Sequence, residues 1–163
     1  VLLEPFERGK ITEESLIRFG ILHNEINNPQ LFINISNNKR KISVKYVGAS
    51  IKKYFGVSIK TYRSIPGYPL EQGYYIVPSI KRTHIGISEI VKFVDIGDDY
   101  YVAYFNVYPA PLSAVKDIEG YLSKINKDIV DVDIMKATIK KINENGTSRY
   151  ILIDYILLET VMY

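Results

Sequence analysis

One histidine of this chain has the position and neighbours that acid–base chemistry needs. His23 falls on the apolar face of a helix expected near the N-terminus, where an imidazole that titrates near neutral pH suits a general acid or base. Asp154 or Tyr155, on the last expected strand, would orient the ring and complete such a site. The same position also suits a core histidine that is satisfied by one hydrogen bond. We expect this second role, and therefore no catalytic residue.

Tyrosine forms the next candidate group, because 14 of the 163 residues are tyrosines. Strand alternation places Tyr100, Tyr104 and Tyr108 on one face of a sheet. Tyrosine joins a large apolar ring to a polar hydroxyl, so such a stripe suits contact with a sugar ring or a protein partner. The alternative is a sheet face half covered by residues 113–126. The candidate ligand-binding residues are His23, Tyr100, Tyr104, Tyr108 and Tyr155.

Charge is unevenly placed along the chain. Residues 1–82 hold 13 basic and 6 acidic residues, whereas residues 83–163 hold 8 and 12, for a net charge of +3. Lys45 and Lys52 lie together on one side of an expected helix, with Lys53 beyond them. These three lysines form a candidate anion site for wall teichoic acid, lipid head groups or nucleic acid. An ordinary solvated helix face is the alternative. We expect no nucleic acid partner, because the net charge is small and no recognition motif is present.

Several classes of chemistry are excluded by composition. The absence of cysteine removes disulfides, thiolate catalysis and cysteine-based zinc sites, and two histidines do not make a histidine metal cage. Nucleotide-binding glycine loops and hydrolase or metalloprotease motifs are also missing. Two groups of aspartates lack the spacing of a calcium loop, so we expect no metal and no cofactor. These groups are Asp95, Asp98 and Asp99, and Asp128, Asp131 and Asp133.

Two helices are expected in the first part of the chain. Thr12 followed by two acids indicates a helix start, and the helix should stop before Pro29. Within it, one face is expected to carry Leu16, Phe19, His23 and Ile26. Ile17 and Gly20 should widen this face, and Ile21 and Leu22 should lie toward its flanks. After a short extended segment at residues 31–35 and a polar loop at residues 36–41, Ser43 should cap a second helix that Gly56 closes.

The rest of the chain is expected to be mostly antiparallel sheet. Residues 74–77, 90–96 and 100–108 have strand patterns, and Gly97-Asp98-Asp99 is a hairpin link. Residues 113–126 have helical spacing that Gly120 interrupts. A second hairpin, residues 133–143 and 148–158, turns at Asn145-Gly146. In its last strand Ile151, Ile153, Tyr155 and Leu157 should share one face, with Asp154 on the other. The class is α+β, and we expect one domain over residues 1–163.

The order of these elements resembles a known group of domains. The second helix ends in Lys52-Lys53-Tyr54-Phe55-Gly56, and the Tyr74-Tyr75 strand and two hairpins follow it. This series is similar to extracytoplasmic domains in lipoproteins and secreted proteins of low-GC Gram-positive bacteria. The resemblance implies a cone-shaped α+β fold like that of nuclear transport factor two, also called cystatin-like, in which a curved sheet wraps an N-terminal helix.

The interpretation that follows is a non-enzymatic binding or protein-interaction domain on the cell surface or outside the cell. Its ligand would be a small molecule, a cell-wall component or a protein, and a membrane would be reached only through an anchor upstream of Val1. The first alternative is a small hydrolase- or isomerase-like enzyme that uses His23 and a carboxylate. The second is a structural module of a longer surface protein. A homodimer joined through the oppositely charged halves is also expected, and self-association that weakens at high salt would indicate it.

Overall fold

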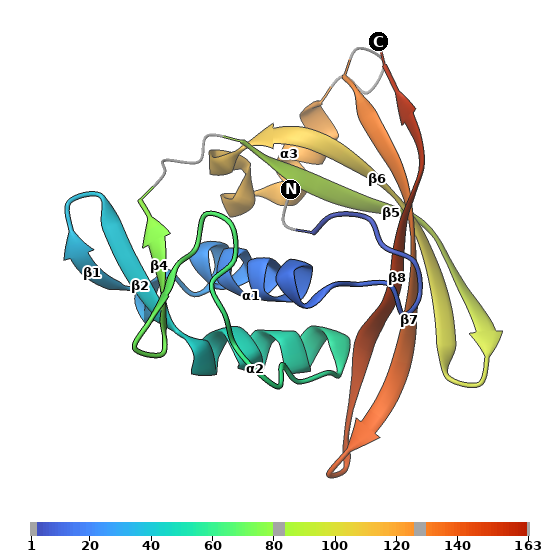
Figure 1. Ribbon diagram of the computed structural model, residues 1–163. Coiled ribbons are helices and arrows are strands. Elements are labelled where there is room, and N and C mark those ends of the chain that lie inside the picture. The colour runs from blue at the N-terminus through green and yellow to red at the C-terminus, as the bar shows by residue number, and fades with distance from the viewer. Residues whose placement is uncertain (1–2, 80–83, 126–129, 163) are drawn as a thin grey trace. The chain divides into compact units, whose positions relative to one another are not determined.

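The computed structural model describes residues 3–79, 84–125 and 130–162, which form two compact units (Figure 1). The helical unit contains residues 3–4 and 10–79, and the sheet unit contains residues 5–9, 84–125 and 130–162. Each unit has its own four-stranded antiparallel sheet. The α+β class predicted from the sequence is therefore confirmed. The cone-like arrangement and the single domain stay predictions.

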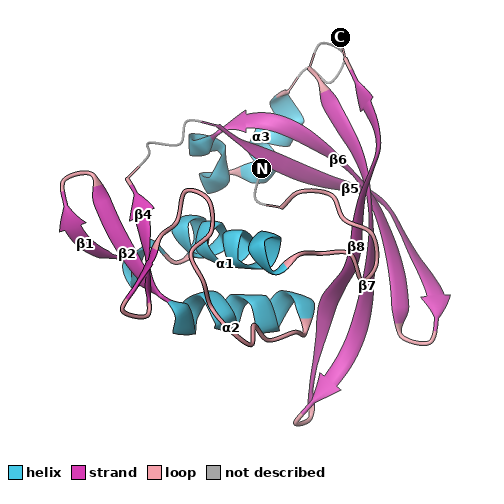
Figure 2. Ribbon diagram, viewed as in Figure 1, coloured by secondary structure: helices cyan, strands magenta, loops and turns pink. Residues whose placement is uncertain are grey.

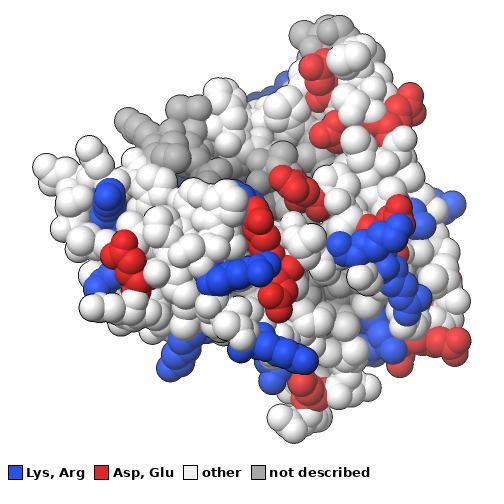
Figure 3. Space-filling view, in the orientation of Figure 1, with Lys and Arg blue, Asp and Glu red and all other residues white. Residues whose placement is uncertain are grey.

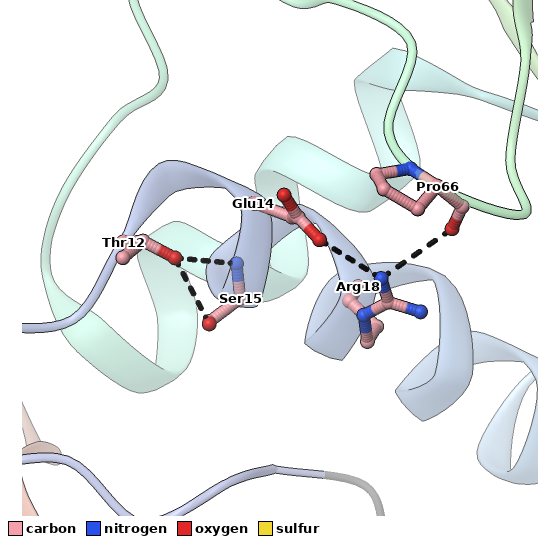
Figure 4. A network of polar contacts seen from close by, with 5 residues as sticks. All are labelled: Thr12, Glu14, Ser15, Arg18 and Pro66. Carbon is pink, nitrogen blue, oxygen red and sulfur yellow. Dashed lines mark hydrogen bonds and ion pairs between the residues drawn. The ribbon is translucent and has the colours of Figure 1, made fainter.

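The first helix of the helical unit begins where its capping residues predict. Helix α1 spans Glu13–Asn27, and the Thr12 hydroxyl accepts the amide hydrogen of Ser15 at 3.1 Å. Glu14 pairs with Arg18 at 3.0 Å, and Arg18 also donates to the Pro66 carbonyl oxygen at 3.4 Å (Figure 4). The chain then leaves the α-helix ahead of the short 3₁₀ helix η1, Pro29–Leu31. A cap, first-turn acids and a following proline were enough to define this helix.

The second helix, α2, spans Val44–Phe55 and runs antiparallel beside α1 (Figure 1). Ser43 caps its first turn, and Gly56 closes it with a φ of 71°. Val47 and Ile51 are fully buried on its inner side. A Cβ atom placed on Gly20 of α1 would lie 2.8 Å from both the Val47 side chain and the Val47 carbonyl oxygen. Glycine at position 20 therefore allows the two helix backbones to approach closely.

The most buried face of α1 differs from the one that helical spacing predicted. Ile17 and Ile21 are fully buried and Asn24 is 2% exposed, whereas Phe19 and His23 are only half-buried. Leu16, Ile17 and Gly20 of the expected face are buried as predicted, whereas the central place given to Phe19 and His23, and the flank position given to Ile21, are wrong. The reason is the close approach at Gly20, which brings the Ile17–Gly20–Ile21–Asn24 side of the helix against α2.

The small sheet of the helical unit contains two strands that the sequence did not indicate, β2 (Lys39–Ser43) and β3 (Leu70–Glu71). The others are β1 (Ile33–Ser36) and β4 (Tyr74–Pro78), and the order across the sheet is β1-β2-β4-β3. The polar loop expected at residues 36–41 is thus largely a β-hairpin. Lys41 lies 4.5 Å from the centre of the Tyr74 ring, and Arg40 pairs with Glu25. These partners come from distant segments, so the basic run carries no strand signal of its own.

The sheet unit is a meander of four long strands (Figure 2). They are β5 (His84–Gly97), β6 (Tyr100–Pro111), β7 (Val132–Glu144) and β8 (Thr147–Val161). Asp98 and Asp99 have positive φ values at the first hairpin, and Asn145 and Gly146 have them at the second, so both predicted turns are confirmed. Strand β6 continues to Pro111, beyond its expected end. Past Val107 its only partner among the described residues is β5, so Pro109 and Pro111 interrupt no second set of ladder hydrogen bonds there.

Bulges in the two outer strands decide which side chains share a face of this sheet. In β5, Ile90 lies opposite Phe105 and Lys92 opposite Tyr104, which leaves Val91 as an extra residue. In β8, Leu152 lies opposite Ile139 and Asp154 opposite Thr138, which leaves Ile153 extra. Each bulge reverses the alternation of its strand.

The two faces that result have different chemistry. The aromatic face carries Phe93, Tyr101, Phe105, Tyr150 and Tyr155, and the basic face carries Lys92, Tyr100, Tyr104, Lys136 and Lys140. The expectation that Ile151 and Tyr155 share a face is wrong, because the bulge at Ile153 lies between them. Ile151 lies instead on the basic face with Asp154.

One end of the basic face is covered by the segment after β6. This segment forms the 3₁₀ helix η2 (Leu112–Lys116) and the helix α3 (Ile118–Lys124), separated by Asp117. Ala114, Tyr121 and Leu122 pack with Ile87 and Ala110, and the Tyr121 hydroxyl donates to the Pro109 carbonyl oxygen at 2.8 Å. The expected helix over residues 113–126 is therefore helical in two short pieces, and its last residue lies outside the described part.

The buried polar contact between α1 and α2 gives a stability prediction. The Asn24 amide donates to the Gly20 carbonyl oxygen at 2.8 Å and to the Ser50 hydroxyl at 2.9 Å. We expect Asn24→Ala to lower the free energy of unfolding by about 1–3 kcal/mol, because it leaves buried acceptors without their donor. Urea unfolding of the single variants N24A and S50A and of the double variant measures the coupling. Strictly additive losses of stability in the double variant would contradict a stabilising hydrogen bond between Asn24 and Ser50.

Candidate functional site

His23 lies among aromatic rings in the helical unit. Its ring stacks on Phe19 with centroids 5.5 Å apart, and the Tyr54 ring centre is 4.7 Å away. The Asn27 amide nitrogen lies 3.2 Å from Nδ1, which acts as the acceptor when Nε2 carries the proton. Burial, followed by the positive charge of Lys53, lowers the pKa of His23. The imidazole is therefore held neutral, and no carboxylate of a described residue contacts it.

The two residues expected to assist His23 belong to the sheet unit and lie on opposite faces of its sheet. The Asp154 carboxylate accepts the backbone amide hydrogen of Thr138 at 3.0 Å, beside the β8 bulge. The Tyr155 ring stacks on Phe105 at 5.8 Å, and its backbone bonds with Phe6 in both directions. Burial, with a smaller effect from Asp133, raises the pKa of Tyr155. Asp154 and Tyr155 thus each hold a structural position in the sheet.

The three tyrosines of the expected stripe do lie on one face, but their surroundings differ. Tyr108 is 2% exposed, and its hydroxyl donates to Glu89 at 3.1 Å. Tyr104 is half-buried, with the Lys92 ammonium 5.8 Å from its ring centre. Tyr108 is therefore a core residue, and the accessible part of the stripe is Tyr100 with Tyr104. Their role as ligand-binding residues stays a prediction.

Tyr100 is surrounded by cations. Arg8 donates to its hydroxyl oxygen at 2.8 Å, and the Lys140 ammonium lies 4.8 Å from the ring centre. The hydrogen bond from Lys140 and the charges of Lys140 and Arg8 lower the pKa of Tyr100. The phenol therefore acts here as a hydrogen-bond acceptor between two positive groups.

The lysines of the expected anion site are exposed on α2. Lys52 and Lys53 lie in its last turn, where positive charge is favourable near the free carbonyl groups. The Lys53 ammonium also lies 5.0 Å from the Tyr54 ring centre. Lys45 is exposed in the first turn. Helix-end electrostatics accounts for Lys52 and Lys53, and anion binding at these three lysines stays a prediction.

An exposed aromatic group was missed at the sequence level. The rings of Phe93 and Tyr101 stack at 5.5 Å, and Tyr101 meets Tyr150 edge-on at 5.7 Å. Phe93 is 53% exposed and Tyr150 is 50% exposed. We call Phe93, Tyr101 and Tyr150 the aromatic triad. Alternation within one strand had no means of finding it, because its rings come from three strands and only the pairing between those strands, with the register shift at Ile96, brings them onto one face.

Other features of the described residues add no further candidate. An open depression at the β1–β2 turn is lined by residues 34–37 and contains none of the predicted site residues. Within the described ranges, no group of three or more acidic or histidine side chains is placed to hold a metal ion, and Asp128 lies outside them. Among the same residues no helix has the length and apolarity to cross a membrane. Figure 3 shows basic and acidic side chains interspersed on one side of the molecule.

Comparisons of this chain with protein-family models, with curated proteins and with solved structures find no match. The function proposed for this chain therefore rests on the residues and surfaces described above.

The neutral state of His23 predicts a pH dependence of stability. Because the pKa of His23 is lowered from its ordinary value of 6.5, the unfolded chain takes up the proton first as the pH falls. The contribution of the neutral His23 ring to the free energy of unfolding is fully present above pH 6.5. It is lost as the pH falls from 6.5 toward the lower pKa of His23 in the folded protein. Urea unfolding at a series of pH values should show this loss in the native protein but not in His23→Gln. The variant H84Q is the control, and a loss that vanishes there instead would contradict the assignment.

Proposed function

We propose that this chain is a non-enzymatic extracytoplasmic binding or protein-interaction domain of a bacterial lipoprotein or secreted protein. The aromatic triad is the observation that carries the binding role. Tyrosine and phenylalanine are enriched at protein interfaces, and exposed clusters of rings mark interaction sites. The resemblance in element order to extracytoplasmic domains supports the location.

The form of the triad suits recognition of a partner with apolar surface or a sugar ring. Its three rings come from β5, β6 and β8, so the sheet holds them in place before any ligand arrives. A rigid platform loses little conformational entropy on binding. Ile90, 66% exposed, lies on the same face and extends the apolar surface along β5.

The alternative of a small enzyme that uses His23 receives less support. The described contacts of the ring are Phe19, Tyr54 and the Asn27 amide, and the charge that acts on it comes from Lys53. A general base needs an orienting group and a place for a reacting atom. Packing between rings is the role that these contacts favour.

The triad can be tested with soluble cell-wall fragments as the probe. We expect saturable chemical-shift changes in the labelled full chain, centred on Phe93 and Tyr150, and a loss of affinity of at least about tenfold in F93S/Y150S. Tyr46→Ser is the matched control, because Tyr46 is 38% exposed on α2, outside the triad. Thermal unfolding of each variant shows that the fold is kept. Equal weakening in Y46S, or no saturable binding by the native chain, would contradict the proposal.

The extracytoplasmic location has its own test. Protease added to intact cells that express the complete gene product should digest this domain while a cytoplasmic marker survives. Lysis before digestion is the control that shows both proteins are cleavable. Protection of the domain in intact cells would contradict the location without affecting the binding role of the triad.

A further inference from the structure

The basic face of the sheet unit carries a strip of four cations arranged around two tyrosines. Lys92 and Lys136 lie directly opposite Tyr104, one on each neighbouring strand, and Lys140 lies opposite Tyr100. Arg8 comes from the N-terminal segment and reaches both the Tyr100 hydroxyl, at 2.8 Å, and its ring, at 5.2 Å from the centre. We call Arg8, Lys92, Lys136 and Lys140 the basic strip.

The four cations of the basic strip are not paired with acids of the described residues, although the carboxylates of Asp154 and Glu159 lie on the same face of the sheet. Among the described residues, none of its four cations forms an ion pair with a carboxylate; Arg8, Lys92 and Lys140 contact aromatic rings instead. The nearby Asp154 carboxylate accepts the Thr138 amide hydrogen, and Glu89 accepts from Tyr108 at the covered end of the face. Like charges held close together disfavour each other, and a bound anion would relieve that repulsion.

The spacing of the strip indicates an extended ligand. Tyr100 and Tyr104 are four residues apart on one strand, so their surrounding cations form two centres about 13 Å apart. A single small anion contacts one centre only. A linear chain with repeated negative groups reaches both centres when it lies along β6.

The chemistry of the strip favours phosphate groups without bases. Arginine and lysine are the usual partners of phosphate oxygens. Proteins that bind single-stranded nucleic acid stack the bases on free aromatic rings. Here the Tyr100 and Tyr104 rings already have cations beside them. We propose that the basic strip binds an extended phosphate-bearing chain that lacks bases, at a site separate from the aromatic triad.

The experiment is calorimetric titration of the full chain with a short linear inorganic polyphosphate. Orthophosphate, single-stranded DNA of similar charge and anionic vesicles are titrated in parallel. We expect saturable polyphosphate binding, stronger than for any of the other three, which weakens at least about tenfold in K136Q/K140Q and as salt is raised. The variant K136R/K140R keeps both charges and should restore binding. Thermal unfolding confirms that each variant folds.

The matched control is K39Q/K60Q, which removes the same charge from exposed positions of the helical unit, outside both the basic strip and the candidate anion site on α2. Equal weakening in this control would overturn the proposal, because it would show a response to net charge alone. Tighter binding of DNA, or binding of vesicles but not of polyphosphate, would also overturn it. The triad lies on the opposite face of the sheet, so F93S/Y150S should leave polyphosphate binding unchanged. Failure of either proposal therefore leaves the other standing.

Discussion

Over its described residues, the hydrogen-bond ladder of the sheet unit is interrupted twice in β5 and twice in β8, and the faces of its central part depend on the interruptions at Val91 and Ile153. A strand that alternates without interruption sends every second side chain to the same face. The extra residues Val91 in β5 and Ile153 in β8 reverse that order partway along each outer strand. At the second bulge the Asp154 carboxylate accepts the Thr138 amide hydrogen, which gives a ladder group a partner where the register shifts. An uninterrupted β8 would separate Tyr150 from Tyr155, and an uninterrupted β5 would exchange the faces of Lys92 and Phe93 relative to Ile90.

The bulges explain how one sheet offers two surfaces of different chemistry. Rings from three strands meet on the aromatic face, and Phe105, Met135 and Ala137 form its buried part. Cations flank Tyr100 and Tyr104 on the basic face, whose far end is covered by η2 and α3. Both surfaces lie on one meander, in which the strands follow one another across the sheet in the same order as along the chain, β5-β6-β7-β8. The four strands and their bulges are therefore enough to form both the aromatic face and the basic face.

The helical unit is organised by a different constraint, the close approach of α1 and α2 at Gly20. That approach selects Ile17, Ile21 and Asn24 as the inner side of α1 and leaves His23 at its margin. At the margin, Phe19 and Tyr54 contact the imidazole, and Lys53 disfavours its protonation. The pKa of His23 is thus lowered as a result of packing. Its contacts show how a histidine on an apolar helix face takes a structural position without an acidic partner.

The sequence by itself determined the local elements, because their signals are carried by adjacent residues. Thr12, Ser43 and Gly56 defined the ends of two helices, and Asn145-Gly146 defined a hairpin. It also placed Tyr100, Tyr104 and Tyr108 on one face, since β6 contains no bulge. Only the tertiary structure decided four other features: strand β2, the inner side of α1, the burial of Tyr108 and the aromatic triad. Each depends on a partner from a distant segment: β4 for β2, Val47 for Gly20, Glu89 for Tyr108, and the pairing between strands for the triad. Register between strands is a property of the pair, so one strand's own pattern does not determine it.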